Sequence, residues 1–172
     1  MANLALNQNQ TFQSAMLGMV TMDPQPSTFA AQILPSSAAT VINAGQAVKL
    51  VGTAGSMIIV DICASPSDGP VFGVIAYNMR DNNGYVPGDT VEIVGRGGVM
   101  MLKSSAAIVR GTNVSITNNT ATTNDPTVAT DTTVGDYIAG VALGQASAAN
   151  QLIKVQISQG IISATGVISV TP

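Results

Sequence analysis

The stretch Gly45-Gln46-Ala47-Val48-Lys49-Leu50 opens a pattern, Gly-x-x-Val-x-(Leu/Ile), that decides the fold class of this chain. The pattern returns at residues 88–93 and 111–116. In each copy the glycine permits a turn with positive φ, and the residues after it alternate between the two faces expected of a β-strand. The three copies therefore predict strands that each begin at a turn.

Further short runs rich in β-branched residues follow from about Thr40 onward, separated by Gly, Pro and Asn turns. The chain lacks the helical patterns of about 10 to 15 residues that a parallel α/β sheet needs between its strands. We therefore predict an all-β fold, a small β-barrel or β-sandwich with an extended, largely irregular N-terminal arm. The expected strands cover residues 47–51, 57–62, 71–77, 90–94, 99–102, 113–117, 137–143, 152–157 and 161–170.

A second repeat pairs Phe72-Gly73-Val74-Ile75-Ala76 with Ala139-Gly140-Val141-Ala142-Leu143. Both runs are apolar on two faces, which predicts central strands, and the glycine within each suits a bulge or the close approach of another backbone. We interpret the repeats as a recurring turn-and-strand pattern within one barrel. The polar, threonine-rich segment 118–133 is expected to be a loop.

The first 39 residues differ from the rest, because Asp23 is their only charge and three prolines interrupt them. We predict an arm at residues 1–39 and a β-domain at residues 40–172. Short helical spacings occur at residues 12–19 and between residues 29 and 33. Uncharged apolar segments usually mark contact surfaces, although these residues could also pack back on their own domain. The hypothetical anchors for a partner are Phe12, Met16, Met19, Met22, Phe29 and Ile33.

The composition of the 172 residues excludes several function classes. The chain has no His, a single Glu and a single Cys, which excludes Ser-His-Asp triads, Cys-His dyads and His-bearing metal sites. A net charge of −3 disfavours nucleic acid, which needs clustered Lys and Arg. No apolar run approaches the roughly 18 residues of a membrane span, and no signal peptide is evident. We predict a non-enzymatic protein made in a cytoplasm, without cofactor, metal, nucleic-acid or membrane partner, in which Cys63 is buried.

Three local clusters have weaker chemical interpretations. The Gly95-Arg96-Gly97-Gly98 stretch is followed by an apolar strand rather than by a helix, so a turn is favoured over a phosphate loop. In Lys103-Ser104-Ser105, neighbouring residues of a strand point to opposite faces, which disfavours a Ser-Lys nucleophile. Acidic residues near 81–92 and 131–136 could hold calcium, but they match no EF-hand spacing and serve equally as turn formers.

Five segments together resemble the capsid cement, or head-decoration, proteins of tailed bacteriophages. The resemblance covers roughly residues 40–158, and the order and spacing of the segments matter more than any one of them. They are Ala44-Gly45-Gln46-Ala47-Val48-Lys49-Leu50-Val51, Val71-Phe72-Gly73-Val74-Ile75-Ala76, Pro87-Gly88-Asp89-Thr90-Val91-Glu92-Ile93-Val94, Ile108-Val109-Arg110-Gly111 and Ala139-Gly140-Val141-Ala142-Leu143.

This resemblance implies a small β-module on the outer surface of a virion, commonly a homotrimer, that bridges neighbouring subunits of the major capsid protein and stabilises the shell against internal pressure. The alternative is a carbohydrate- or surface-binding β-module of a phage tail or a cell surface. Such modules usually present aromatic platforms, whereas this chain has three Tyr, three Phe and no Trp. The sequence leaves open whether the segment 118–133 contacts a host surface.

Overall fold

The computed structural model describes residues 28–39, 41–77, 84–119 and 126–169, and over these ranges it contains strands and no helix. The all-β prediction is therefore confirmed, and no helix of the described part could cross a membrane. The strands are β1 (Thr28–Ile33), β2 (Ala47–Ala54), β3 (Met57–Ile62), β4 (Gly73–Ile75), β5 (Thr90–Val94), β6 (Val99–Ser104), β7 (Asn113–Asn118), β8 (Thr127–Thr130), β9 (Tyr137–Ala142), β10 (Leu152–Ser163) and β11 (Gly166–Ser169).

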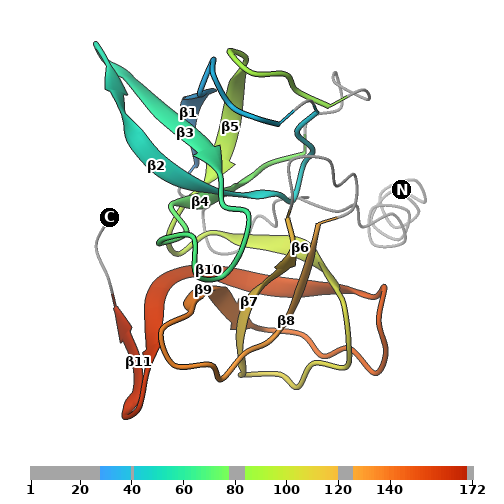
Figure 1. The fold of residues 1–172 in the computed structure, drawn as a ribbon. Coiled ribbons are helices and arrows are strands. Elements are labelled where there is room, and N and C mark those ends of the chain that lie inside the picture. The colour runs from blue at the N-terminus through green and yellow to red at the C-terminus, as the bar shows by residue number, and fades with distance from the viewer. Residues whose placement is uncertain (1–27, 40, 78–83, 120–125, 170–172) are drawn as a thin grey trace, which may run out of the picture.

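The strands form two closed rings, one above the other in Figure 1. The first five strands close in the order β1-β3-β2-β4-β5, because β1 pairs with both β3 and β5. We call this ring barrel 1. The other strands form a sheet in the order β11-β10-β6-β8-β7-β9, and a further pairing of β9 with β10 closes β6 to β10 into a second ring, barrel 2. The short β11 extends β10 as a hairpin outside this ring.

The two barrels share their strand order, strand directions and pairing registers. In each barrel the first strand runs parallel to the third, and the other neighbours are antiparallel. Val48 of β2 pairs with Gly73 on one side and Ile62 on the other, as Val114 of β7 pairs with Gly140 and Thr130. A β-bulge follows at the same place in β2 and in β7. The chain is thus an internal duplication.

This duplication corrects the interpretation of the sequence repeats as a pattern within one barrel. The copies at 45–50 and 111–116 lead into β2 and β7, which are equivalent strands, and the repeat at 72–76 and 139–143 covers β4 and most of β9. The expectation of a close backbone approach at the two glycines is confirmed. A Cβ at Gly73 would lie 2.7 Å from the carbonyl oxygen of Val94, and a Cβ at Gly140 would collide with that of Gln156, the equivalent residue.

Two strands were not predicted, and both corrections have a local reason. Phe29 and Ile33, whose spacing suggested a helix, lie instead on one side of β1. Ala31 lies between them on the same side, so every second residue of the strand faces that way. Barrel 1 therefore begins within the first 39 residues. The expected loop 118–133 contains β8, where Thr127 and Val128 are buried between β6 and β7. Threonine is β-branched and packs well in a sheet, but the polarity of the threonine-rich segment led to the prediction of a loop.

The apolar core is divided between the two barrels and is continuous at their junction. One cluster fills barrel 1, with Ile33, Val48, Ile75 and Ile93 at its centre. The other cluster joins the interior of barrel 2 to the outer face of barrel 1. That outer face consists of Ala47, Cys63, Val71, Val74, Ala76 and Val94. Barrel 1 thus buries its outer face against barrel 2.

A buried asparagine fastens this junction. Asn119 follows β7 and is fully buried; its Nδ2 donates to the carbonyl oxygens of Ala47 (2.8 Å) and Cys63 (2.6 Å). Its Oδ1 accepts a hydrogen bond from the backbone N–H of Ala47 at 3.1 Å. The Nε2 of Gln159 adds a hydrogen bond to the carbonyl oxygen of Phe72 at 3.0 Å. Because these amide groups satisfy buried backbone atoms, they fix how the two barrels meet.

Candidate functional site

The residues considered for chemistry have structural partners. Ser104 is buried, and its Oγ donates to the carbonyl oxygen of Ala148 (3.0 Å) and accepts from the N–H of Gln151 (3.2 Å). Gly97, with a φ of 88°, lies in the turn that connects the two barrels. In the described part of the chain, no three acidic or cysteine side chains group as they would around a metal ion.

The acidic turn residues bind backbone atoms. An Oδ2 of Asp89 accepts the N–H of Val86 at 2.8 Å, and an Oδ1 of Asp131 accepts the N–H of Thr133 at 2.8 Å. Burial opposes the ionisation of Asp131, but hydrogen bonds from Thr133 and neighbouring side chains outweigh it and lower its pKa. These carboxylates act as turn formers, and residues 78–83 lie outside the described part.

Cys63 is buried at the junction of the two barrels. Desolvation raises the pKa of its thiol to about 12, with a contribution from the charge of Asp68. Because the thiolate is the reactive form, this cysteine is suited to packing rather than to nucleophilic chemistry.

Two of the six residues proposed as anchors of an arm, Phe29 and Ile33, lie in the part of the chain that the structure describes. Phe12, Met16, Met19 and Met22 lie outside the described residues. Ile33 is 1% exposed in the core of barrel 1, so it is not accessible to a partner of the folded barrel. Phe29 is half-buried, and its ring meets that of Phe72 edge to face, with centroids 5.2 Å apart. The alternation of apolar and other residues along 28–33 is the sequence signal that could have assigned Phe29 and Ile33 to a strand of the barrel rather than to an arm.

Comparison of the two barrels identifies an apolar surface that sequence reasoning missed. Four apolar residues of barrel 1 are not buried: Phe29, Ile58 and Phe72 are partly buried against its core and Leu50 is exposed, and we call this set the open end. Their register equivalents in barrel 2 are all buried: Met100, Ile116, Pro126 and Ala139. Leu50 is 39% exposed, whereas Ile116 is 2% exposed. The difference arises because barrel 2 is covered by the outer face of barrel 1, whereas no strand among the described residues covers barrel 1 in the same way.

The hairpin of β2 and β3 extends this surface. It projects from barrel 1 at the upper left of Figure 1, and its strands pair up to Ala54 and Met57 around the turn at Gly55. No charged residue occurs from residue 50 to residue 60, and Val51 is 49% exposed. Exposed edge strands usually carry charges or prolines that discourage pairing with other chains. The uncharged part of the hairpin, residues 50–60, is therefore typical of a contact surface.

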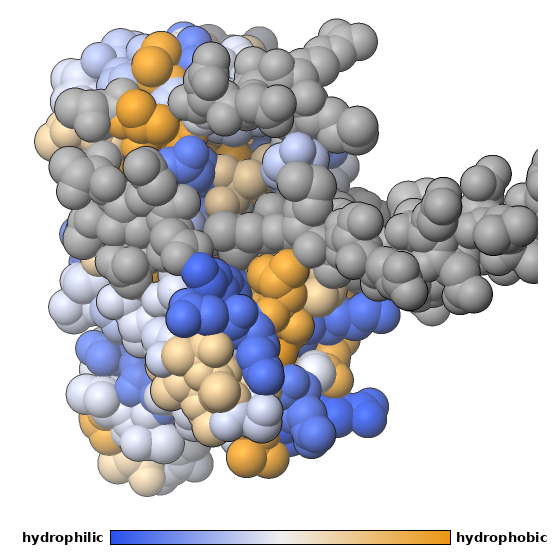
Figure 2. Space-filling view, turned by 90° about the vertical axis from the view of Figure 1, so that its right-hand side faces the viewer, coloured by the Kyte–Doolittle hydropathy of each residue, from blue (hydrophilic) through white to orange (hydrophobic). Residues whose placement is uncertain are grey.

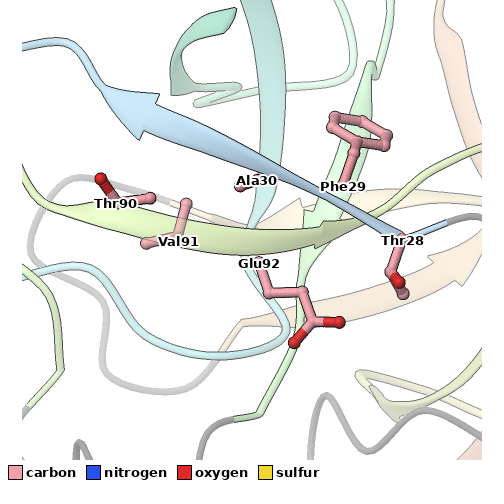
Figure 3. A pocket seen from close by; sticks show the side chains of 6 residues that line it. All are labelled: Thr28, Phe29, Ala30, Thr90, Val91 and Glu92. Carbon is pink, nitrogen blue, oxygen red and sulfur yellow. The ribbon is translucent and has the colours of Figure 1, made fainter. Parts of the chain in front are cut away.

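The face of the molecule seen in Figure 2 is mixed outside the grey atoms. Figure 2 shows apolar residues in small separate groups among hydrophilic ones over both barrels, outside the atoms drawn in grey. A hollow of about 440 Å³ lies over β1 and β5, lined by Thr28, Phe29, Ala30, Thr90, Val91 and Glu92 (Figure 3). The hollow has a single carboxylate and no second acidic or nucleophilic group in its lining, which is not the composition of a hydrolytic site.

The comparisons with known proteins agree with this non-catalytic surface. The sequence profile of the family described as "Structural cement protein (E217 gp24/Pam3 gp6)", a phage cement family, matches residues 6–158. The chain therefore belongs to the phage structural cement proteins, which are structural components of the capsid and not enzymes.

Among solved structures, the chain is similar to the N base of head fiber gp8.5 of bacteriophage phi29. The identity is 16% and the TM-score 0.48, with 76% of this chain and 92% of that chain covered. No curated protein matches the chain.

Proposed function

We propose that this protein binds the outside of a phage head, bridges neighbouring subunits of the major capsid protein and stabilises the shell against internal pressure. The observation that carries the proposal is the open end of barrel 1, whose side chains are buried at the equivalent positions of barrel 2. Covering such apolar side chains yields about 25 cal/mol for each Å² removed from water. In a cement protein the cover is a capsid subunit.

A second copy could cover the open end in the way that barrel 1 covers barrel 2. It would then present the outer face of its barrel 2, and that face matches the open end poorly. Inside the chain, the cover is the outer face of barrel 1, which is formed by small apolar residues. The equivalent face of barrel 2 carries Asn113, Asp131 and Gln156 where barrel 1 has Ala47, Cys63 and Val94. Burying three polar side chains against apolar ones without partners is unfavourable. This mismatch favours a different protein as the cover.

Bridging requires more than one contact for each molecule. The β2–β3 hairpin supplies a contact beside the open end, and Phe12, Met16, Met19 and Met22 remain our candidates for a contact with a second subunit. Linked contacts raise the overall affinity without a strong single one. A protein that binds the mature shell in preference to free subunits stabilises that shell by mass action. Assembly as a homotrimer would multiply these contacts.

The proposal is tested by binding to purified heads that lack this protein. A variant with Leu50→Ser and Val51→Ser should lose affinity by about tenfold or more, because both side chains lose apolar contact. The matched control replaces two exposed valines elsewhere, Val109→Ser and Val134→Ser, which are 70% and 63% exposed. Equal affinity of the two variants would remove the open end and the hairpin from the capsid contact.

A deletion separates the arm from the barrel. It should end at residue 27, because a deletion to residue 39 would remove β1 and open barrel 1. We expect a folded protein with weakened head binding, and unchanged binding would exclude the first 27 residues from the contact.

Quantitative mass spectrometry of virions should give a copy number that is a large, simple fraction of that of the major capsid protein. A handful of copies for each particle would contradict the cement function.

A further inference from the structure

The duplication places two sheet faces in equivalent positions, one on each barrel. Ala30 lies opposite Glu92 on β1 and β5, as Met101 lies opposite Lys154 on β6 and β10. Thr90 is likewise equivalent to Leu152, since these residues pair with Gln32 and Lys103. We call Ala30, Thr90 and Glu92 the β1–β5 face, and Met101, Leu152 and Lys154 the β6–β10 face.

The two faces carry side chains of different length. On the β1–β5 face, Ala30 and Thr90 are short and exposed, and they line the hollow of about 440 Å³. Glu92 and Thr28 point to the side of the two strands opposite to Phe29 (Figure 3). On the β6–β10 face, the equivalent positions hold the long side chains of Met101 and Leu152, both only partly buried. A hollow in one barrel thus corresponds to longer, partly exposed apolar side chains at the equivalent positions of the other.

The two faces also have opposite charges. Glu92 and Lys154 occupy equivalent positions and are both exposed. In the described part of the chain the ion pair is Lys49–Asp68, so neither Glu92 nor Lys154 is neutralised there. Apart from Arg96 in the connecting turn, the described residues of barrel 1 carry four carboxylates and one lysine, a net −3, and those of barrel 2 carry three cations and two carboxylates, a net +1. They are Asp61, Asp68, Asp89, Glu92 and Lys49, and Lys103, Arg110, Lys154, Asp131 and Asp136.

We propose that the β1–β5 face of one copy binds the β6–β10 face of a second copy. Lys154 then meets Glu92, while Met101 and Leu152 enter the hollow beside Ala30 and Thr90. The contact is between different faces, so it repeats from copy to copy and produces a ring when its rotation closes. This contact rests on the self-assembly that is part of the proposed function, and it specifies which surfaces the copies use to assemble. Complementary charges favour this pairing and oppose contact between like faces.

Sedimentation velocity of the full chain over a dilution series tests the contact. The wild type should associate, and association should weaken in about 1 M salt, which screens exposed charges. Glu92→Lys or Lys154→Glu alone should lower the association constant by about tenfold or more, because each places like charges together. The double variant with both exchanges should recover association, as should an equimolar mixture of the two single variants.

Arg110→Glu is the matched control, since it changes the net charge as Lys154→Glu does but lies outside both faces. It should associate like the wild type. An entirely monomeric wild type, single variants that associate normally, or a double variant no better than the singles would each overturn the contact, as would an equal loss in Arg110→Glu.

Head binding of the same proteins separates the two proposals. If the wild type binds heads but never associates with itself, the contact between copies is wrong and the cement function stands. If the wild type associates through these faces but does not bind heads, the contact is supported and the cement function is wrong. Circular dichroism of each variant verifies that the barrels are folded before either assay.

Discussion

Replacing Asn119 with leucine should strongly destabilise the protein, because this side chain holds the junction of the barrels. The substitution keeps a side chain of similar size but removes three hydrogen bonds, two with Ala47 and one with Cys63. The carbonyl of Ala47 still accepts the N–H of Cys63 at 3.1 Å. The N–H of Ala47 and the carbonyl of Cys63 lose their hydrogen-bonding partner in a buried place, at about 1 to 3 kcal/mol each.

The expected loss is therefore about 2 to 6 kcal/mol, a large fraction of the roughly 5 to 15 kcal/mol that stabilises a typical domain. Urea denaturation followed by far-ultraviolet circular dichroism measures it, since the chain has no Trp. Asn119→Ala should cost less than Asn119→Leu, because the smaller side chain leaves room for a water that can bridge the two backbone groups.

Asn113→Leu is the control, because Asn113 lies partly exposed on β7 and the change should stay within about 0.5 kcal/mol. A loss below about 1 kcal/mol for Asn119→Leu would refute the reasoning that unpaired backbone groups at the junction dominate. Two separate unfolding transitions in the variant would show in addition that the junction couples the barrels.

Three further predictions follow from packing and charge. Gly140→Ala should prevent folding or cost several kcal/mol in thermal denaturation, because its Cβ would collide with a backbone oxygen, whereas Gly52→Ala, with open space around it, should be nearly neutral. Cys63 should resist a thiol reagent near pH 8 in the native protein and react once the protein is unfolded, because burial raises its pKa from 9.0 to about 12. The stability of the protein should also fall as the pH rises above about 9, because the thiol of the unfolded chain ionises first. Burial opposes the ionisation of Asp68, but its hydrogen bonds with Lys49 and the backbone lower its pKa, so Asp68→Asn should cost about 0.2 to 1 kcal/mol of stability at neutral pH. Because the advantage of the wild type is lost as the pH falls through that lowered pKa, the stabilities of the two proteins should converge in acid. A stability difference that stays constant with pH would exclude the ion pair as its source.

The open end was not accessible to sequence reasoning for a definite reason. Leu50 and Ile116 stand at the same position of the same repeat, and both are apolar strand residues. A sequence pattern assigns them the same environment, because it records the period of the strand and not what lies at the end of the barrel. Only the packing of barrel 1 on barrel 2 makes one of them a core residue and leaves the other exposed.

The sequence by itself determined the all-β class, most of the strands, a bulge or close backbone approach at residues 73 and 140, and the exclusion of His-based chemistry, since these depend on local period, turn geometry and composition. The tertiary structure decided that the repeats are two barrels, that residues 28–33 and 127–130 are strands, and that Ile33 is a core residue rather than an anchor. It also decided which barrel is covered by the other within the described residues. The physical reason is that strand pairing and barrel closure join residues far apart in the chain, and whether an apolar side chain is buried depends on those distant partners.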